Sequence, residues 1–148
     1  MTDFYCVRPE VAGQAVVKGD ESDSSAKLHY EFDGWLGDEL LESVVQYIVT
    51  DELLNELRAD DLTGYWVGEV EVSKSPKFEH RNSGKELPEF HWLRVRGTSR
   101  VDDFGIDERY FEEYDSYGDV LVVSEGALSV LRERQLAHAD IELYESDE

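Results

Sequence analysis

Residues 120–131 read Val-Leu-Val-Val-Ser-Glu-Gly-Ala-Leu-Ser-Val-Leu, and this stretch decides the fold. Its first four residues form a short apolar run of the kind found in a fully buried strand. Ser124 is a favourable N-cap residue, and Leu128 and Leu131 then lie on one face of a helix. The segment therefore predicts a buried strand that leads directly into a helix.

The same order of features occurs earlier in the chain. Residues 47–49, Tyr-Ile-Val, form a brief apolar strand, and Thr50 is the N-cap that follows it. Asp51 and Glu52 come where the positive end of a helix dipole stabilises acidic side chains, and the apolar helical face is formed by Leu53, Leu54 and Leu57. The chain thus contains two predicted strand–helix–strand units. Duplication and convergence on a common supersecondary unit both account for them.

Alternation of apolar and polar residues predicts most of the other strands. It is clearest where Leu28, Tyr30 and Phe32 alternate with His29, Glu31 and Asp33. Strands are expected over residues 4–8, 28–32, 67–73, 90–96 and 138–143. Residues 38–43 are expected to form a short helix with Leu40 and Leu41 facing the core, and residues 74–88 a loop or only local helix.

These elements predict an α+β fold: a mixed or antiparallel sheet with two or three short helices packed on it. A chain of 148 residues has the usual length of one domain and can close a hydrophobic core without disulfide or metal staples. We therefore expect a single domain over residues 1–148. Its irregular segments would be an acidic loop at 13–26, an acidic aromatic loop at 101–119 and an acidic tail at 145–148.

The charge of the chain limits its partners. Asp and Glu number 35 against 14 Lys and Arg, which gives a formal net charge of −21. Nucleic acids and anionic membranes recruit basic residues, so neither is expected as a direct partner. The chain is nevertheless 41% hydrophobic and 11% aromatic, whereas a disordered acidic chain would be poor in both. A folded domain this acidic must either tolerate its own charge repulsion or use that charge on a basic partner.

Cysteine content and hydropathy predict a cytoplasmic protein. Cys6 is the single cysteine, so an internal disulfide is excluded and a reducing compartment fits best. It lies within an apolar strand, which favours a buried structural thiol over a reactive one. No segment approaches the roughly 18 apolar residues that a transmembrane helix requires, and residues 1–4 do not begin a secretory signal.

Motifs for catalysis are missing from the sequence. It contains no phosphate-binding glycine loop, no H-E-x-x-H and no G-x-S-x-G, so we predict no catalytic residue, cofactor or metal. Two triples combine a histidine with two carboxylates along one strand face: His29, Glu31, Asp33 and His138, Asp140, Glu142. Either could bind a divalent metal or act in acid–base chemistry. The favoured interpretation is a solvent-facing strand, because alternation requires polar residues there regardless of function.

The stretch from Asp102 to Asp119 is the strongest compositional feature. It holds eight acidic residues against Arg109 alone, interleaved with Phe104, Tyr110, Phe111, Tyr114 and Tyr117. Acidic side chains attract a basic partner at long range, and aromatic side chains supply the anchors that carry binding energy. The alternative is a solvated loop whose aromatics pack back onto the core. The preceding basic stretch could pair with it internally, through Lys77, Arg81, Lys85, Arg94, Arg96 and Arg100.

Several phrases together resemble a known family. They are residues 30–38 (Tyr-Glu-Phe-Asp-Gly-Trp-Leu-Gly-Asp), 87–93 (Leu-Pro-Glu-Phe-His-Trp-Leu), 102–105 (Asp-Asp-Phe-Gly) and 122–125 (Val-Val-Ser-Glu). Their order is similar to that in an α+β immunity-protein family of bacterial polymorphic toxin systems, formerly a domain of unknown function. The resemblance runs from Tyr5 to Glu142. It implies neutralisation of a cognate toxin and supplies no catalytic residues.

This hypothesis names the residues expected to contact the toxin. They are Asp33, Trp35 and Asp38 around a turn, Asp102, Asp103 and Phe104 at the start of the acidic loop, and Tyr110 and Tyr114 within it. Structural roles are open alternatives: Asp33 could shape the turn, Trp35 could belong to the core, and the paired aspartates could cap the loop. Two rival hypotheses are a histidine–carboxylate metal-binding or hydrolytic domain and a globular protein whose acidity is an adaptation to salt.

Overall fold

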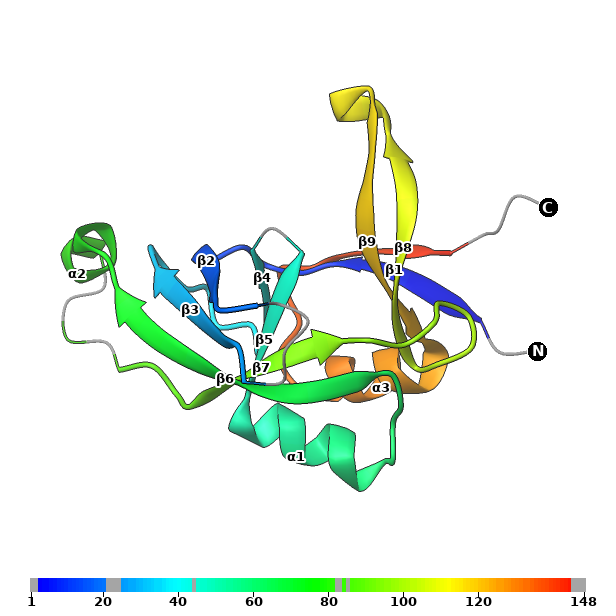
Figure 1. Ribbon diagram of the computed structural model, residues 1–148, viewed down its shortest axis with the longest axis horizontal. Helices are drawn as coiled ribbons and strands as arrows, with labels where there is room; N and C mark the ends of the chain where they lie inside the picture. The colour runs from blue at the N-terminus through cyan, green and yellow to red at the C-terminus, as the bar shows by residue number, and fades with distance from the viewer. Residues whose placement is uncertain (1–2, 21–24, 44, 82–83, 85, 145–148) are drawn as a thin grey trace.

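The computed structural model describes residues 3–20, 25–43, 45–81, 84 and 86–144 (Figure 1). They form an α+β fold with two sheets and helices packed on them, which confirms the predicted class. The six-stranded sheet has the order β2 (Gly13–Lys18), β3 (Lys27–Phe32), β6 (Tyr65–Lys74), β7 (Phe90–Val95), β5 (Gln46–Thr50) and β4 (Leu40–Ser43). The four-stranded sheet has the order β10 (Asp140–Leu143), β1 (Phe4–Arg8), β9 (Ser116–Ser124) and β8 (Phe104–Phe111).

The two predicted strand–helix–strand units have the same topology. Helix α1 (Asp51–Ala59) connects β5 to β6, and β7 lies between these strands, antiparallel to both. Helix α3 (Glu125–Glu133) connects β9 to β10, and β1 lies between them in the same manner. Each helix therefore joins two parallel strands across one inserted antiparallel strand, once in each sheet.

Both helices begin at the predicted caps. The Leu53 amide donates to Thr50 Oγ1 at 3.2 Å, and the Ala127 amide donates to Ser124 Oγ at 3.1 Å. In each case the cap residue has extended backbone angles and an acidic residue opens the first turn. A side-chain acceptor satisfies an amide that the helix leaves without a partner, and the acid stabilises the positive end of the dipole.

Strands β4, β5 and β7 separate two hydrophobic cores. The first core lies between these strands, helices α1 and α3 and the four-stranded sheet; its centre includes Leu40, Tyr47, Val49, Leu54, Leu57, Leu93, Phe104, Leu121, Val123, Leu128 and Leu131. The second core is covered by the six-stranded sheet and includes Leu28, Tyr30, Phe32, Leu41, Ile48, Phe78, Phe90 and Trp92. The Ala15 amide donates to Ser43 Oγ at 3.1 Å, so edge strands β2 and β4 approach each other around this core.

Two sequence predictions are wrong for reasons that this arrangement explains. Residues 38–43 contain strand β4 instead of a helix, because Leu40 and Leu41 face opposite cores and only a strand points neighbouring side chains in opposite directions. Residues 13–18 form strand β2 instead of part of an acidic loop, and they pair with β3 along its whole length. The acidic composition that suggested a loop belongs to the residues after Gly19.

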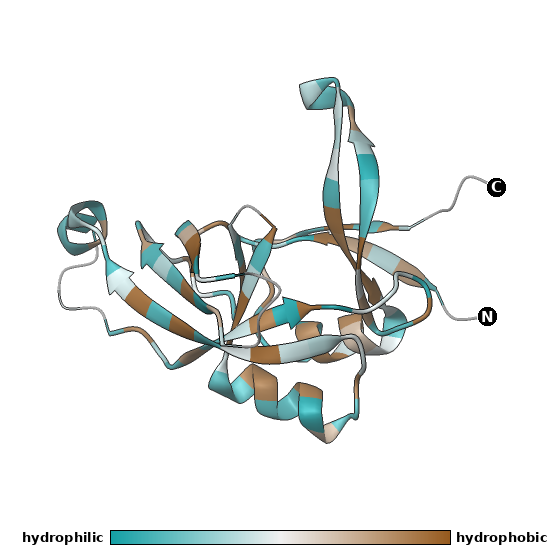
Figure 2. Ribbon diagram, in the orientation of Figure 1, coloured by the Kyte–Doolittle hydropathy of each residue, from teal (hydrophilic) through white to brown (hydrophobic). Residues whose placement is uncertain are grey.

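The expected acidic loop is also wrong, since residues 104–124 form a long hairpin. Strands β8 and β9 pair from Phe104↔Val123 to Phe111↔Ser116, and a turn of 3₁₀ helix (Glu112–Tyr114) closes the end. Asp115 takes a left-handed conformation there, at φ 47°. The hairpin projects from the body of the protein (Figure 1), and its residues change from largely hydrophobic at the base to hydrophilic at the far end (Figure 2).

The remaining predictions hold with adjusted ends. Strands β1, β3, β6, β7 and β10 lie within or around the expected ranges, and the local helix expected in residues 74–88 is α2 (Pro76–Arg81). Cys6 is buried as expected, and burial raises the pKa of its thiol. Residues 21–24, Lys85 and the predicted tail at 145–148 lie outside the described residues.

The two caps give a prediction for stability. Thr50→Ala and Ser124→Ala should each lower the free energy of unfolding by about 1 kcal/mol, because each leaves a helix amide without its acceptor. Urea denaturation measures the loss. Ser129→Ala is the matched control: Ser129 is exposed within α3, where alanine is at least as good a helix former. Equal midpoints for the cap variants and the control would contradict the assignment.

Candidate functional site

A cleft of about 400 Å³ opens where the start of α1, the residues before β7 and the end of α3 meet. Its lining residues are Trp35, Gly37, Glu39, Thr50, Asp51, Glu52, Pro88, Glu89, Arg134 and Gln135. The lining combines four carboxylates with one guanidinium and one indole. Its field therefore favours cations, and the indole offers an apolar face beside them.

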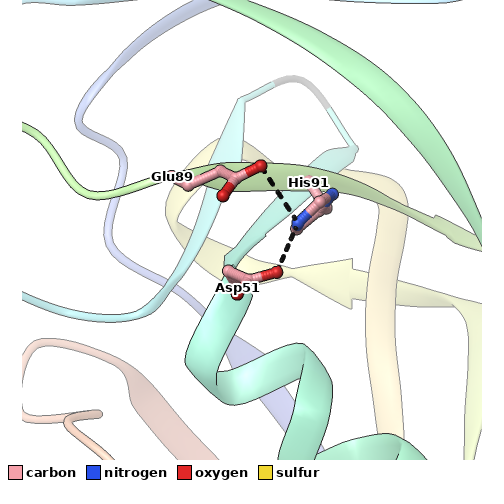
Figure 3. Close-up of side chains that lie close together, drawn as sticks. All are labelled: Asp51, Glu89 and His91. Carbon is pink, nitrogen blue, oxygen red and sulfur yellow. Dashed lines mark hydrogen bonds and ion pairs between the residues drawn. The ribbon is translucent and has the colours of Figure 1, made fainter.

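One wall of the cleft continues into a histidine with two carboxylates. His91 Nε2 lies 2.8 Å from Asp51 Oδ1 and 3.9 Å from Glu89 Oε1. Figure 3 shows both acids directed toward the same ring nitrogen. Their potential ligand atoms all lie within 4.8 Å of one another. The His91 side chain is 27% exposed, whereas that of Glu89 is 72% exposed.

Sheet register brings this group together. Thr50 lies opposite Phe90, and Val49 lies opposite His91, so the chain leaves β5 for α1 beside the start of β7. The Asp51 amide donates to the Glu89 carbonyl at 2.9 Å and extends this pairing by one step. The backbone thereby fixes the separation of the two acidic residues, whatever their side chains do.

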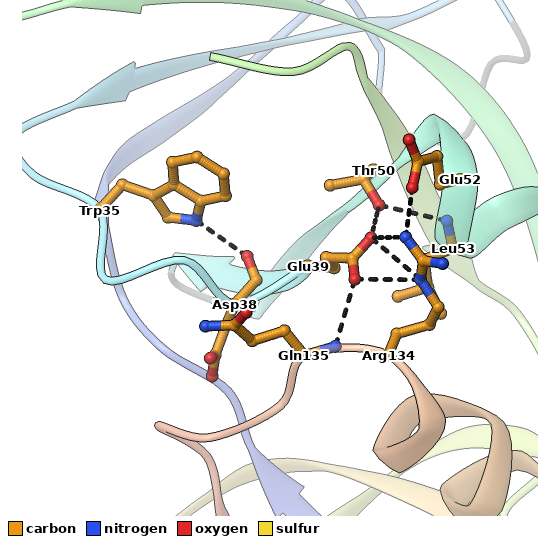
Figure 4. A network of polar contacts seen from close by, with 8 residues as sticks. All are labelled: Trp35, Asp38, Glu39, Thr50, Glu52, Leu53, Arg134 and Gln135. Carbon is orange, nitrogen blue, oxygen red and sulfur yellow. Dashed lines mark hydrogen bonds and ion pairs between the residues drawn. The ribbon is translucent and has the colours of Figure 1, made fainter. Parts of the chain in front are cut away.

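A second polar group joins the end of α3 to the start of α1 (Figure 4). Arg134 Nε donates to Glu39 Oε2 and Nη2 donates to Glu39 Oε1, each at 3.0 Å, and Nη2 also reaches Glu52. The Thr50 hydroxyl donates to Glu39 Oε1 at 2.7 Å, and the Gln135 amide donates to Oε2 at 3.2 Å. Glu39 thus receives a two-point contact from arginine and two neutral hydrogen bonds.

This environment changes the pKa of both charged partners. Burial alone would raise the pKa of Glu39, but hydrogen bonds from Arg134, Thr50 and Gln135 outweigh burial and leave the pKa below its usual value. Hydrogen bonds to Glu39 and Glu52 raise the pKa of Arg134. The pair is therefore ionised at neutral pH and ties α3 to α1 beside the cleft.

The residues predicted around the turn have structural contacts. Asp38 is fully buried, and its carboxylate accepts hydrogen bonds from the amides of Ala137 (2.9 Å) and His138 (2.8 Å). The Trp35 indole donates to the Asp38 carbonyl at 2.8 Å, and the Asp33 amide donates to the Ala12 carbonyl at 2.8 Å. Asp38 is thereby withdrawn from any partner, while Trp35 is half-buried and lines the cleft.

The residues predicted at the start of the acidic segment hold the hairpin base. Asp102 Oδ2 accepts from the Thr98 amide at 2.8 Å. Asp103 Oδ2 accepts from the Thr63 amide at 2.9 Å, and Asp103 Oδ1 accepts from the Ser124 hydroxyl at 2.6 Å. Phe104 is fully buried in the first core, so it is withdrawn from any partner as Asp38 is.

The two predicted tyrosines lie at the far end of the hairpin. Tyr110 is 41% exposed and Tyr114 is 67% exposed, and Tyr117 beside them is 69% exposed. Tyr110 and Tyr117 are directly opposite in the hairpin, with ring centroids 5.2 Å apart. The alternative that these aromatics pack back onto the core is thus wrong for these three side chains.

Neither histidine triple from the sequence forms a metal-ligand group among the described residues. His29 Nε2 pairs with Ser73 Oγ at 2.8 Å, and Glu142 forms an ion pair with Arg109. The group that the structure does assemble, Asp51, Glu89 and His91, was not predicted. The sequence predicted a strand over residues 90–96, which includes His91, but the pairing of His91 with Asp51 depends on the register between β5 and β7.

No protein-family model matches the chain, and no curated protein matches it. Within the described ranges, no helix has the length and apolar character needed to cross a bilayer.

The Glu39–Arg134 contact predicts how stability changes with pH. Glu39→Gln should lower the free energy of unfolding at pH 7 by about 2 kcal/mol, since hydrogen bonds to a charged group are lost. The folded pKa of Glu39 lies below the unfolded value of about 4.3, so its contribution is present above that pH and disappears as pH falls through the folded pKa. The gap between wild type and variant should therefore close on acidification.

Urea denaturation between pH 7 and pH 3 measures this gap. Glu56→Gln is the control, because Glu56 is an exposed glutamate on α1 outside the Glu39–Arg134 contact. A gap for Glu39→Gln that stays constant over the pH range would contradict an ionised Glu39 in the contact.

Proposed function

We propose that the protein is a non-enzymatic immunity protein of the bacterial cytoplasm. It binds a cognate toxin domain and blocks access to the toxin's substrate. The observation that carries this proposal is the projecting end of the β8–β9 hairpin, where Tyr110, Tyr114 and Tyr117 are exposed among acidic side chains. Exposed tyrosines grouped in this way are typical anchors of protein–protein interfaces.

Contacts on one face of the hairpin hold its end in place. The guanidinium carbons of Arg8 and Arg109 lie 5.0 Å and 5.7 Å from the Phe111 ring centroid. Arg8 also pairs with Glu113 at 3.1 Å, and Arg109 pairs with Glu142. Arginine contacts with an aromatic face are attractive, so the Arg8 contacts connect the hairpin to β1, and the Arg109–Glu142 ion pair connects it to β10. The opposite face presents the Tyr110–Tyr117 pair to solvent.

This division into a fixed face and an open face suits binding. A side chain that is already held loses less conformational freedom when a partner arrives. Tyr110 donates a hydrogen bond to Asp115, which raises the pKa of Tyr110 and orients its ring. The tyrosines are therefore arranged as anchors before any contact forms.

The surrounding charge indicates the kind of partner. Glu108, Glu112, Asp115 and Asp119 are exposed along the same segment, and the whole chain carries −21. Such a surface accelerates association with a basic protein, as the phosphate-binding surface of a nuclease toxin would be. Immunity of this type requires a folded scaffold and a complementary surface, and it needs no catalytic group.

Co-expression tests the proposal. The protein should restore growth to cells that produce the toxin domain encoded by the neighbouring gene, and the purified pair should co-elute. Tyr114→Ala and Tyr117→Ala should each weaken the affinity at least tenfold, since exposed tyrosine anchors carry a large share of binding energy. The association rate should fall as salt is added, because screening shortens the reach of the acidic surface.

The control is Trp66→Ala, which removes another exposed aromatic side chain, 57% exposed on β6 and not part of the hairpin. Its affinity should match that of the wild type. The proposal fails if growth is not restored, or if the tyrosine variants bind as tightly as the control.

A further inference from the structure

We propose that Asp51, Glu89 and His91 form a binding site for one divalent transition-metal ion, with Zn²⁺ as the best-matched ion. The site is separate from the hairpin end and does not rest on the proposed immunity function. Its three potential ligand atoms converge within 4.8 Å of one another. They come from three different places in the fold: the first turn of α1, the residue before β7, and the second position of β7.

The geometry requires only small movements to hold an ion. Zn²⁺ binds imidazole nitrogen and carboxylate oxygen at about 2.0–2.2 Å, which sets neighbouring tetrahedral ligands roughly 3.3 Å apart. The present separations from His91 Nε2 are 2.8 Å to Asp51 Oδ1 and 3.9 Å to Glu89 Oε1, on either side of that value. Both carboxylates are directed toward His91 Nε2 (Figure 3). An ion placed between them and the ring would therefore replace the existing hydrogen bond between His91 and Asp51.

The backbone holds the three ligand residues in place, which favours binding of an ion. Asp51 and Glu89 are linked through the backbone hydrogen bond of 2.9 Å, and His91 is fixed within the central strand β7. The Glu89 side chain is 72% exposed and can rotate the short distance needed to complete the site. Two ligands are thus held by the fold, and the third closes at little cost.

Charge also favours a cation. Asp51 and Glu89 together balance a divalent ion, and Glu39 and Glu52 line the adjoining cleft. Arg134, the cation of that cleft, is engaged with Glu39 and Glu52 instead of with Asp51 or Glu89. The positive end of α1 opposes a cation here, but Thr50 already binds the Leu53 amide, and the two carboxylates outweigh the partial charge that remains.

The ligand types select among metals. Imidazole suits Zn²⁺ and its transition-metal neighbours, whereas Mg²⁺ and Ca²⁺ prefer sites made of oxygen alone. Three protein ligands leave at least one position open to the cleft for water or for a group from a partner. An ion would also remove the repulsion between Asp51 and Glu89, so bound metal should stabilise the folded chain.

Calorimetric titration of the full, untagged chain with Zn²⁺ alone tests the site. Wild-type protein should bind one equivalent, and its melting temperature should rise with added Zn²⁺; Mg²⁺ at the same concentration should leave the melting temperature unchanged. Glu89→Gln and His91→Gln should each weaken binding at least tenfold and abolish the shift. Glu89→Gln keeps the test decisive, because this exposed side chain can change without loss of folding.

Matched controls remove the same residue types elsewhere. His138→Ala and Glu86→Gln replace exposed side chains outside the three-ligand group and should bind Zn²⁺ as the wild type does. The proposal is overturned if the wild type shows no saturable one-to-one binding. It is also overturned if either ligand variant binds as tightly as the controls, since diffuse attraction to an acidic surface would then explain the uptake.

Discussion

Burial of β4, β5 and β7 on both faces is the constraint on which the rest of the structure depends. Each strand sends one side chain into the first core and its neighbour into the second, as Leu40 and Leu41 do. These strands need cover on two sides. Helices α1 and α3 and the four-stranded sheet supply it on one side, and β2, β3 and β6 of their own sheet, with α2, supply it on the other. The start of α1 is therefore fixed against β7, and this same fixed junction assembles the cleft and its histidine.

The shortage of basic side chains determines how the loops accommodate their carboxylates. With 35 acidic residues and 14 basic ones, ion pairs cannot neutralise every carboxylate that the fold draws inward. Backbone amides take that role instead: Asp38 binds two amides before β10, Asp102 binds that of Thr98, and Asp103 binds that of Thr63. A carboxylate with amide donors loses little on burial, so these acids organise turns. This explains how Asp38, an acid expected to contact a partner, can be fully buried.

The sequence predicted local features well and long-range ones poorly. The caps at Thr50 and Ser124, the helical faces after them and the alternating strand β3 all follow from neighbouring residues. Residues 38–43 and 104–119 were misread because their conformation depends on what lies opposite. A strand buried on both faces loses its alternation, and an exposed hairpin end has no apolar face to reveal its period. The Asp51–Glu89–His91 group was hidden for the same reason, since sheet register alone unites it.

The hairpin extends further than the cores require. Phe104, Leu121 and Val123 complete the first core, and Cys6, Val120 and Val122 form a small cluster behind it. Beyond Asp107 the two strands add exposed tyrosines and acids, and ordering such a segment costs conformational entropy. Packing of the half-buried Phe111 against the small cluster returns some of it. Arginine contacts with Phe111 offset part of that cost. The order of this end thus maintains its exposed surface, where Tyr110, Tyr114 and Tyr117 lie.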